Sequence, residues 1–188
     1  RVPELFRPEE IFDQPGTWEQ LPCQAHRRPY HSVASVLSDG SVVSAGGTSP
    51  GHSEPYHTLE VYYPWYWYYG TRPKLTDWPD PVTAPINTLN DPNLVSETFS
   101  ISVDASCFPV QRVALLSPAS VTHAFDFNQR YVELAISSAV PNGPTGTLDI
   151  KKPEDNYVTP PGYYYLIIID NQGAPSIGRW VRISAAGV

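Results

Sequence analysis

The sequence predicts an all-β chain in two parts, and three observations support that prediction. The 188 residues include 21 prolines and 12 glycines spread among many aromatic side chains, which is typical of short strands joined by turns and nearly excludes long helices. A Glu-x-x-x-Pro segment at residues 4–8 recurs at residues 60–64. In the second half of the chain, runs rich in β-branched and aromatic residues alternate with turn signals.

Residues 1–68 are predicted to be the last part of a repetitive strand architecture. Asp39-Gly40 lies between β-rich runs at residues 30–37 and 41–45, and Asp-Gly in that position is a strong hairpin signal. Gly46-Gly47 closes the second run, and a Gly-Thr-Trp segment precedes the hairpin. A period of about 50 residues with these features is typical of a kelch-type propeller blade.

One blade and the end of another cannot close a propeller. Their strand edges would be bare, and an isolated hairpin is marginal in water. We therefore expect further propeller strands, from an upstream region or a separate chain. The sequence contains no methionine, so Arg1 is not expected to be a translational start, and the chain is expected to be processed or cut from something longer.

A proline-rich stretch, residues 68–91, follows and is predicted to lack regular structure, because each proline removes a backbone donor. Beyond it come six candidate strands: Val95–Val103, Arg112–Leu116, Tyr131–Ile136, Thr147–Lys151, Tyr163–Ile169 and Trp180–Ile183. Six or seven short strands in about a hundred residues predict an immunoglobulin-like sandwich, which we assign to residues 69–188.

Composition argues against several functions. The net charge is −7 with only 12 Lys and Arg, so no basic stripe is available for nucleic acid. No apolar run approaches the ~18 residues that suggest a membrane span. Residues 46–51 lack the Lys and following helix of a P-loop and are predicted to be a turn. No Gly-x-Ser-x-Gly elbow supports a hydrolase.

A set of motifs extends through nearly the whole chain. In order they are Arg28-Pro29-Tyr30-His31-Ser32, Leu37–Val42 with Ala45-Gly46-Gly47, Glu60–Pro64 with Thr71-Arg72-Pro73, Val121-Thr122-His123-Ala124 with Asn128-Gln129-Arg130, Pro160–Tyr164, and Gly173–Ser176. Together they resemble, in the correct order, the final propeller blade and C-terminal domain of the galactose oxidase and glyoxal oxidase family of copper radical oxidases.

The resemblance implies a secreted enzyme that oxidises primary alcohols, aldehydes or sugars with O2 and releases H2O2. In that family one copper ion is held by two histidines and two tyrosines. The motif match makes Tyr30 the axial tyrosine and catalytic base, with His31 and His123 as the equatorial ligands. The second tyrosine, cross-linked to a cysteine and carrying the radical, lies in the family's upstream blades, so this cofactor is expected outside the chain.

The residue types suit that chemistry. Imidazole nitrogens and oxygen donors suit Cu(II), and a bound cation lowers the pKa of a phenol from its usual value near ~10. Neighbouring strand residues face opposite ways, so Tyr30 and His31 cannot both reach one metal from a regular strand. Pro29 before them indicates a strand start or loop, where both could converge, and His123 must arrive on a loop of the second part.

Other candidate residues have simpler interpretations. The histidines outside the copper set are interpreted as solvated loop residues: His26, His52 and His57. A structural zinc site would need four ligands. Cys23 and Cys107 permit one disulfide without requiring it, and both states stay open. The aromatic segment at residues 62–69 could stack on sugars, but packing between the two parts is the favoured interpretation.

Two further functions stay open beside the oxidase. One is a catalytically incomplete extracellular module that binds carbohydrate and retains the fold. The other is a structural piece of a larger assembly, held by strand pairing with other chains.

Overall fold

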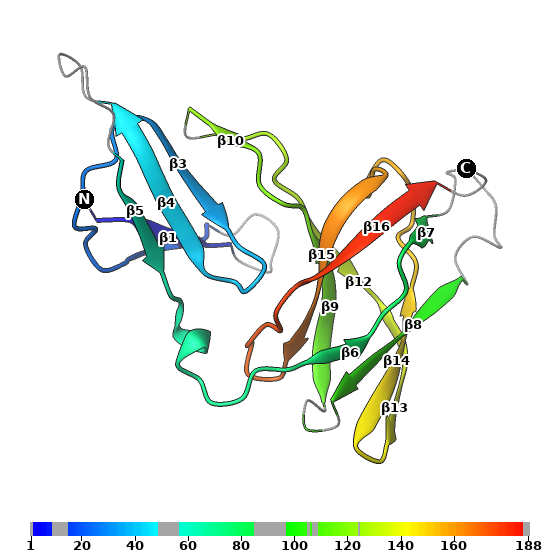
Figure 1. The fold of residues 1–188 in the computed structure, drawn as a ribbon. Helices are drawn as coiled ribbons and strands as arrows, with labels where there is room; N and C mark the ends of the chain where they lie inside the picture. The colour runs from blue at the N-terminus through cyan, green and yellow to red at the C-terminus, as the bar shows by residue number, and fades with distance from the viewer. Residues whose placement is uncertain are drawn as a thin grey trace.

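A computed structural model gives the fold for residues 2–8, 15–48, 57–84, 97–104, 106, 109–123 and 125–185 (Figure 1). His52 and Cys107 lie outside these ranges. Within these ranges the named elements are β-strands and a 3-10 turn, η1, at Trp65–Trp67. The predicted fold class, part of a propeller followed by an immunoglobulin-like sandwich, is confirmed. No helix in the described ranges is long and apolar enough to cross a membrane.

The N-terminal part contains two antiparallel sheets. Their strands are β1 (Glu4–Arg7) paired with β2 (Thr17–Gln20), and β3 (Tyr30–Val36), β4 (Val42–Thr48) and β5 (Leu59–Tyr62) in the order β3-β4-β5. The two Glu-x-x-x-Pro segments thus both contribute strands, β1 and β5. The expected hairpin turn at Asp39-Gly40 is present. Leu37 N donates to Ser41 O at 2.8 Å, and Gly40 has a φ of 79°, which glycine adopts without steric cost.

The C-terminal part is a sandwich of two sheets. One has the order β12-β9-β15-β16-β7, formed by Tyr131–Leu134, Val110–Leu116, Gly162–Asp170, Arg179–Ala185 and Val82–Ala84. The other has the order β13-β14-β8-β6, formed by Ile136–Asn142, Thr145–Lys151, Thr98–Asp104 and Leu75–Asp77. All of these pairs are antiparallel except β16 with β7, which is parallel.

The core lies between these two sheets and follows the period-two alternation of the strands. In β14, Leu148 and Ile150 are fully buried while Asp149 between them points to the other face. Ten apolar core side chains larger than alanine expose no more than 1% of their surface: Ile101, Val103, Val113, Leu115, Leu148, Ile150, Leu166, Ile168, Val181 and Ile183. Burying each contributes roughly 1.5–3 kcal/mol, so the sandwich is a firm base for the loops that leave it.

The proline-rich stretch contains two short strands, which corrects the expectation that it lacks regular structure. β6 and β7 are each the outermost strand of their sheet. Pro79 and Pro81 fall between them and outside both ladders. An edge strand of three residues needs few donors, so this proline spacing permits pairing on either side.

The structure also differs from the prediction of a single strand at residues 131–136. It divides at Ala135 into β12 and β13, which belong to opposite sheets. β13 extends to Asn142 and includes Pro141. β13 is an edge strand, where a missing backbone donor is tolerated.

A small hairpin connects the two parts in space. Its strands, β10 (Val121–Thr122) and β11 (Phe125–Asp126), follow β9, and Figure 1 shows β10 beside the sheet that contains β3. Within the described ranges, no strand of residues 4–62 pairs with a strand of residues 75–185. The boundary near residue 68 itself stays a prediction.

Candidate metal centre

Three aromatic rings that were predicted as copper ligands lie together. The ring centroids of Tyr30 and His31 are 4.1 Å apart, those of His31 and His123 are 4.3 Å apart, and those of Tyr30 and His123 are 5.4 Å apart. Two rings come from the start of β3 and the third from the tip of the β10–β11 hairpin. The structure therefore brings together residues from both parts of the chain at one place.

A tight turn places the side chains of Tyr30 and His31 on the same side of the backbone, so that their rings are in contact. Ser32 N donates to Pro29 O at 3.1 Å, and Ser32 Oγ donates to Arg28 O at 3.2 Å. His31 has a φ of 65°, a left-handed conformation that costs a non-glycine residue roughly 1–2 kcal/mol. This conformation breaks the strand alternation that would otherwise point the two rings apart. The expectation of a strand start after Pro29 agrees with this geometry.

His123 also has left-handed backbone, with a φ of 54°. Its Nδ1 lies 2.8 Å from Thr122 Oγ1, so Nε2 is the ring nitrogen outside this contact. Below the tip, Asp126 Oδ1 accepts hydrogen bonds from Ser120 N at 2.9 Å and Asn128 N at 3.0 Å. These bonds close the base of the hairpin and fix how far His123 extends. Strained backbone held by such bonding is characteristic of functional sites.

Two glycines allow β4 to approach closely the turn at residues 29–32, named the ligand turn because it carries the candidate ligands Tyr30 and His31. Gly47 has a φ of 110°, and a Cβ at this position would lie 2.8 Å from Pro29 Cδ. Gly46 has a φ of 68°, and its added Cβ would lie 3.3 Å from His31 O. Both residues lie within β4 rather than in the turn predicted for residues 46–51. Their lack of side chains leaves room for the turn that carries Tyr30 and His31.

A nearly buried ion pair lies directly before the ligand turn. The Arg28 side chain is 8% exposed, and its Nη2 is 3.1 Å from Glu60 Oε2. Arg28 Nη1 also donates to Thr58 O at 2.9 Å and Gly46 O at 3.3 Å. Sequence reasoning used Arg28 and Glu60 only as motif residues. The ion pair could have been anticipated from the sequence, which has a basic residue directly before Pro29 and a carboxylate in the repeated Glu-x-x-x-Pro segment.

Glu60 is held as a carboxylate by its neighbours. Burial alone would raise its pKa, but hydrogen bonds from Ala25 N and His26 N, with the Arg28 charge, lower the pKa below the usual glutamate value. The pair therefore stays ionised at neutral pH and ties residues 25–28 to β5.

A cavity of about 710 Å³ lies behind the ligand turn, between β3 and residues 116–130. Its lining includes Arg28 and Ser32 from one part and Arg130 from the other, but none of the three clustered rings. Tyr30 is instead 61% exposed. The ring cluster is therefore a surface feature of this chain and separate from the cavity.

The remaining candidate residues do not join the cluster. His26 and His57 are exposed and make no described ring contact with the three clustered rings. Cys23 is exposed and forms no disulfide with another described residue. Because Cys107 is outside the described ranges, the disulfide between them stays a prediction.

The three side chains fit a copper ion chemically. Within the described ranges no three His, Cys, Asp or Glu side chains converge, so a site made only of these ligands has no support there. Two imidazoles and a phenol form a nitrogen and oxygen donor set, which Cu(II) accepts. The backbone strain at both histidines is a second, independent sign that their placement is functional.

The fold and the clustered rings thus define an all-β protein of two parts with a candidate nitrogen and oxygen metal centre between them. Residues 83–183 match the family model described as Galactose oxidase-like, Early set domain, and the chain belongs to this family.

Relatives extend the similarity over the whole chain. A galactose oxidase from Gibberella zeae is 27% identical over 186 residues, covering 96% of this chain and 25% of that protein. An aldehyde oxidase from Vitis pseudoreticulata is 30% identical over 201 residues, covering 96% of this chain and 34% of that protein. The chain thus spans about a quarter to a third of the length of these relatives.

A solved structure shares the fold. A fungal alcohol oxidase, solved in complex with copper, superposes with a TM-score of 0.71 and 20% identity. The match covers 97% of this chain and 36% of that protein. It therefore includes the N-terminal strands as well as the sandwich.

Proposed function

We propose that the chain is the C-terminal part of an extracellular copper radical oxidase that converts primary alcohols or aldehydes to aldehydes or acids and reduces O2 to H2O2. The observation that carries the proposal is the convergence of Tyr30, His31 and His123 from two parts of the chain. The names galactose oxidase and aldehyde oxidase among the relatives support it.

Three side chains of this chain would hold one copper ion: the Tyr30 phenol and the imidazoles of His31 and His123. When bound, copper supplies one-electron redox chemistry and a cation that favours the phenolate. Tyr30 is the proposed general base, and its phenolate oxygen takes the hydroxyl proton of an alcohol substrate. For an alcohol, two electrons and two protons pass in total from substrate to O2, which gives aldehyde and H2O2.

The two histidines are proposed to hold the copper ion in place and to take no part in proton transfer. Thr122 next to His123 leaves Nε2 for the metal, since Nδ1 faces the Thr122 hydroxyl. A metal-bound imidazole whose other nitrogen donates to an oxygen keeps a fixed ring orientation. The turn at residues 29–32 plays the same role for His31.

The rest of the active site is proposed to lie in further propeller strands, upstream or on a separate chain. These would supply the tyrosine cross-linked to cysteine and cover the exposed Tyr30 ring. They would also cover the two outer edges of the sheet β3-β4-β5, which pair with no further strand in the described ranges.

The test uses the complete protein that contains this chain. It would be loaded with copper and supplied with galactose, glyoxal and simple primary alcohols, while O2 uptake and H2O2 release are followed. We expect one copper per chain and equal amounts of O2 consumed and H2O2 formed. If the protein binds glycans but binds no copper and releases no H2O2, the result would instead support the carbohydrate-binding alternative.

A further inference from the structure

The candidate metal centre is divided between two parts that share no strand pairing in the described ranges. Tyr30 and His31 begin β3, whereas His123 extends from the sandwich on its own hairpin. Whatever sets the angle between the sandwich and β3 therefore also sets how far His123 lies from the other two rings.

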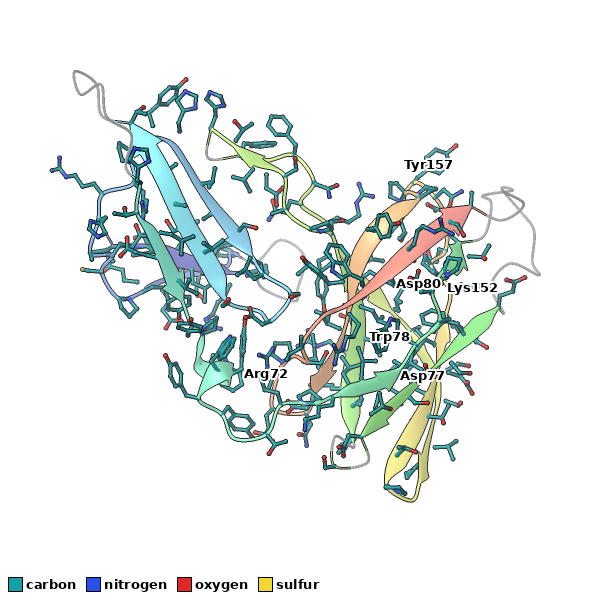
Figure 2. The ribbon with its side chains drawn as sticks, in the orientation of Figure 1. Arg72, Asp77, Trp78, Asp80, Lys152 and Tyr157 are labelled. Carbon is teal, nitrogen blue, oxygen red and sulfur yellow. The ribbon has the colours of Figure 1, made fainter. Side chains whose placement is uncertain are left out.

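A single arginine connects the two parts at the opposite end of β3. Arg72 lies between η1 and β6, and Figure 2 shows it at the junction of the two parts. Its Nη1 donates to Asp39 O at 2.7 Å, in the turn between β3 and β4. Its Nε donates to Pro175 O at 2.8 Å and its Nη2 to Ser176 O at 3.0 Å, in the segment between β15 and β16. One guanidinium thus bonds both parts at once.

Neighbouring contacts reinforce this junction. The Arg72 guanidinium carbon lies 5.3 Å from the ring centroid of Tyr66 and 5.6 Å from that of Trp67, within the range of cation–π attraction. The Tyr66 hydroxyl donates to Gly40 O, and Gly178 N donates to Ser38 O at 2.7 Å. Tyr66 and Trp67 of the aromatic segment therefore pack at the junction, as its favoured interpretation expected.

The chemistry of this junction requires arginine. The carbonyls that accept its hydrogen bonds lie on two sides, and the planar guanidinium supplies donors in a fixed fork that serves both. A lysine keeps the charge, but its single ammonium is a point charge that lacks the planar fork. Burial lowers the Arg72 pKa, while Tyr66 and Asp39 oppose that change. Arginine remains protonated under these conditions.

The distance between junction and metal centre makes the angle important. β3 contains seven residues, which at about 3.3 Å per residue is a rigid span of roughly 20 Å. A tilt of about five degrees at Arg72 would move the far end by roughly 2 Å, and misplacement of about 1 Å is enough to impair a catalytic site.

We propose that Arg72 is a positioning residue for the metal centre: it clamps the sandwich to the β3–β4 turn and so sets the placement of His123 against Tyr30 and His31. The metal part of this inference rests on the proposed copper function. The clamp itself rests only on the contacts of Arg72.

The experiment compares Arg72→Lys and Arg72→Ala with wild type in the complete protein. Arg179→Lys is the matched control, because Arg179 also lies over an aromatic ring, Trp78, at 5.3 Å, but entirely within the sandwich. Copper affinity is measured by titration at a temperature where circular dichroism shows each variant folded. With Cys23 replaced by serine in every background, spin labels at Gln20→Cys in β2 and Val140→Cys in β13 report the distance between the two parts without needing copper.

We expect Arg72→Lys to weaken copper binding by about tenfold or more, the range seen when residues that orient ligands are lost. The spin-label distance distribution should broaden or shift in Arg72→Lys and stay as in wild type in Arg179→Lys. A residue that only stabilised the fold would lower the melting temperature and leave both readouts unchanged below it.

Two results would overturn the inference. One is unchanged copper affinity in folded Arg72→Lys and Arg72→Ala, whatever the distance distribution. The other is an unchanged distance distribution in both variants. If wild type itself binds no copper, the proposed function fails, and the distance measurement alone then decides whether Arg72 is a clamp.

Discussion

The ring centroids of His31 and His123 lie 4.3 Å apart, although His31 lies at the start of β3 and His123 at the tip of the β10–β11 hairpin of the C-terminal part. Both residues have left-handed backbone, with φ values of 65° and 54°. In the described ranges they are the two non-glycine residues with positive φ. The strain is thus concentrated at the two histidines that meet, which indicates that their meeting is maintained against a local cost.

The first prediction separates the roles of Tyr30 and His123. Tyr30→Phe should keep copper, because both imidazoles remain, and should lower turnover by ~10²–10⁴-fold, the usual contribution of a general base. His123→Ala should instead lower copper occupancy. Copper content and H2O2 release of the complete protein check both outcomes. Full activity in Tyr30→Phe, or full copper and activity in His123→Ala, would show that these residues are assigned wrongly.

A second prediction follows from the strain at His31. His31→Ala and His31→Gly both remove the imidazole, so both should bind copper more weakly than wild type. Glycine accepts a φ of 65° without the Cβ penalty, so the metal-free His31→Gly variant should be more stable than His31→Ala by roughly 1 kcal/mol. Denaturant unfolding of the two metal-free variants measures the difference. Equal stabilities would mean that His31 does not hold left-handed backbone.

Thr122 provides a third prediction, on the orientation of the His123 ring. Thr122→Val has nearly the same shape but removes the oxygen that lies 2.8 Å from His123 Nδ1. We expect it to weaken copper binding by about 10–100-fold, while Thr122→Ser, which keeps the hydroxyl, stays near wild type. Copper titration together with the electron paramagnetic resonance spectrum of the bound copper distinguishes altered ligand orientation from a general loss of fold. Unchanged affinity in Thr122→Val would contradict the positioning role.

A fourth prediction concerns pH and the sandwich. Asp149 accepts hydrogen bonds from Ser138 Oγ at 2.6 Å and Ser100 Oγ at 2.7 Å, which connect β13, β14 and β8. The bond from Ser138, then that from Ser100, lowers the Asp149 pKa, and burial opposes them only in part. The folded carboxyl is therefore more acidic than the unfolded one, whose pKa is about 3.9.

The sign of the effect follows from linkage. Ionised Asp149 stabilises the fold fully above the unfolded pKa, and this contribution is lost as the pH falls through the lower folded pKa. The free-energy difference between metal-free wild type and Asp149→Asn should therefore be largest near neutral pH and shrink below about pH 4. Urea unfolding at several pH values measures it. A difference that stayed constant down to strongly acid pH would show that Asp149 does not titrate in this way.

Motif order singled out three side chains that the structure brings together, whereas the contacts that hold them could not be predicted. The roles proposed for Tyr30, His31 and His123 depend on the chemistry of their side chains, and residue types show this chemistry directly. Arg72 bonds to the carbonyls of Asp39, Pro175 and Ser176, and a carbonyl acceptor leaves no mark on residue type. These partners are also far apart in the chain, so only the tertiary fold brings them together.

The strands that were missed have a related cause. β6 and β7 lie among prolines, and local propensity argues against any strand there. They form because the edges of the two sheets offer partners, β8 for β6 and β16 for β7. Tertiary pairing at an edge therefore decides these elements, while the central strands β14 and β15 follow from their own apolar pattern.

The last prediction tests the close packing of β4 on the ligand turn. Gly47→Ala would place a Cβ 2.8 Å from Pro29 Cδ on backbone with a φ of 110°. Gly143 is the matched control, because its φ is 61° and nothing lies within 4 Å of an added Cβ. Both substitutions force alanine into positive-φ backbone that favours glycine, but 61° lies in the left-handed region open to alanine and 110° lies outside it. Only the first substitution also forces Pro29 to move.

We therefore expect Gly47→Ala to destabilise the protein by at least about 1–3 kcal/mol more than Gly143→Ala, since overpacking usually costs that much and the φ of 110° adds backbone strain. Because Pro29 directly precedes Tyr30, the same shift should displace the ligand turn and weaken copper binding, whereas Gly143→Ala should leave copper binding at the wild-type level. Unfolding of the metal-free variants and copper titration of the folded ones measure the two effects separately. If Gly47→Ala lost stability yet bound copper as tightly as Gly143→Ala, the glycine would serve the packing of β4 alone, and the ligand turn would be held by the Arg28 and Ser32 hydrogen bonds without it.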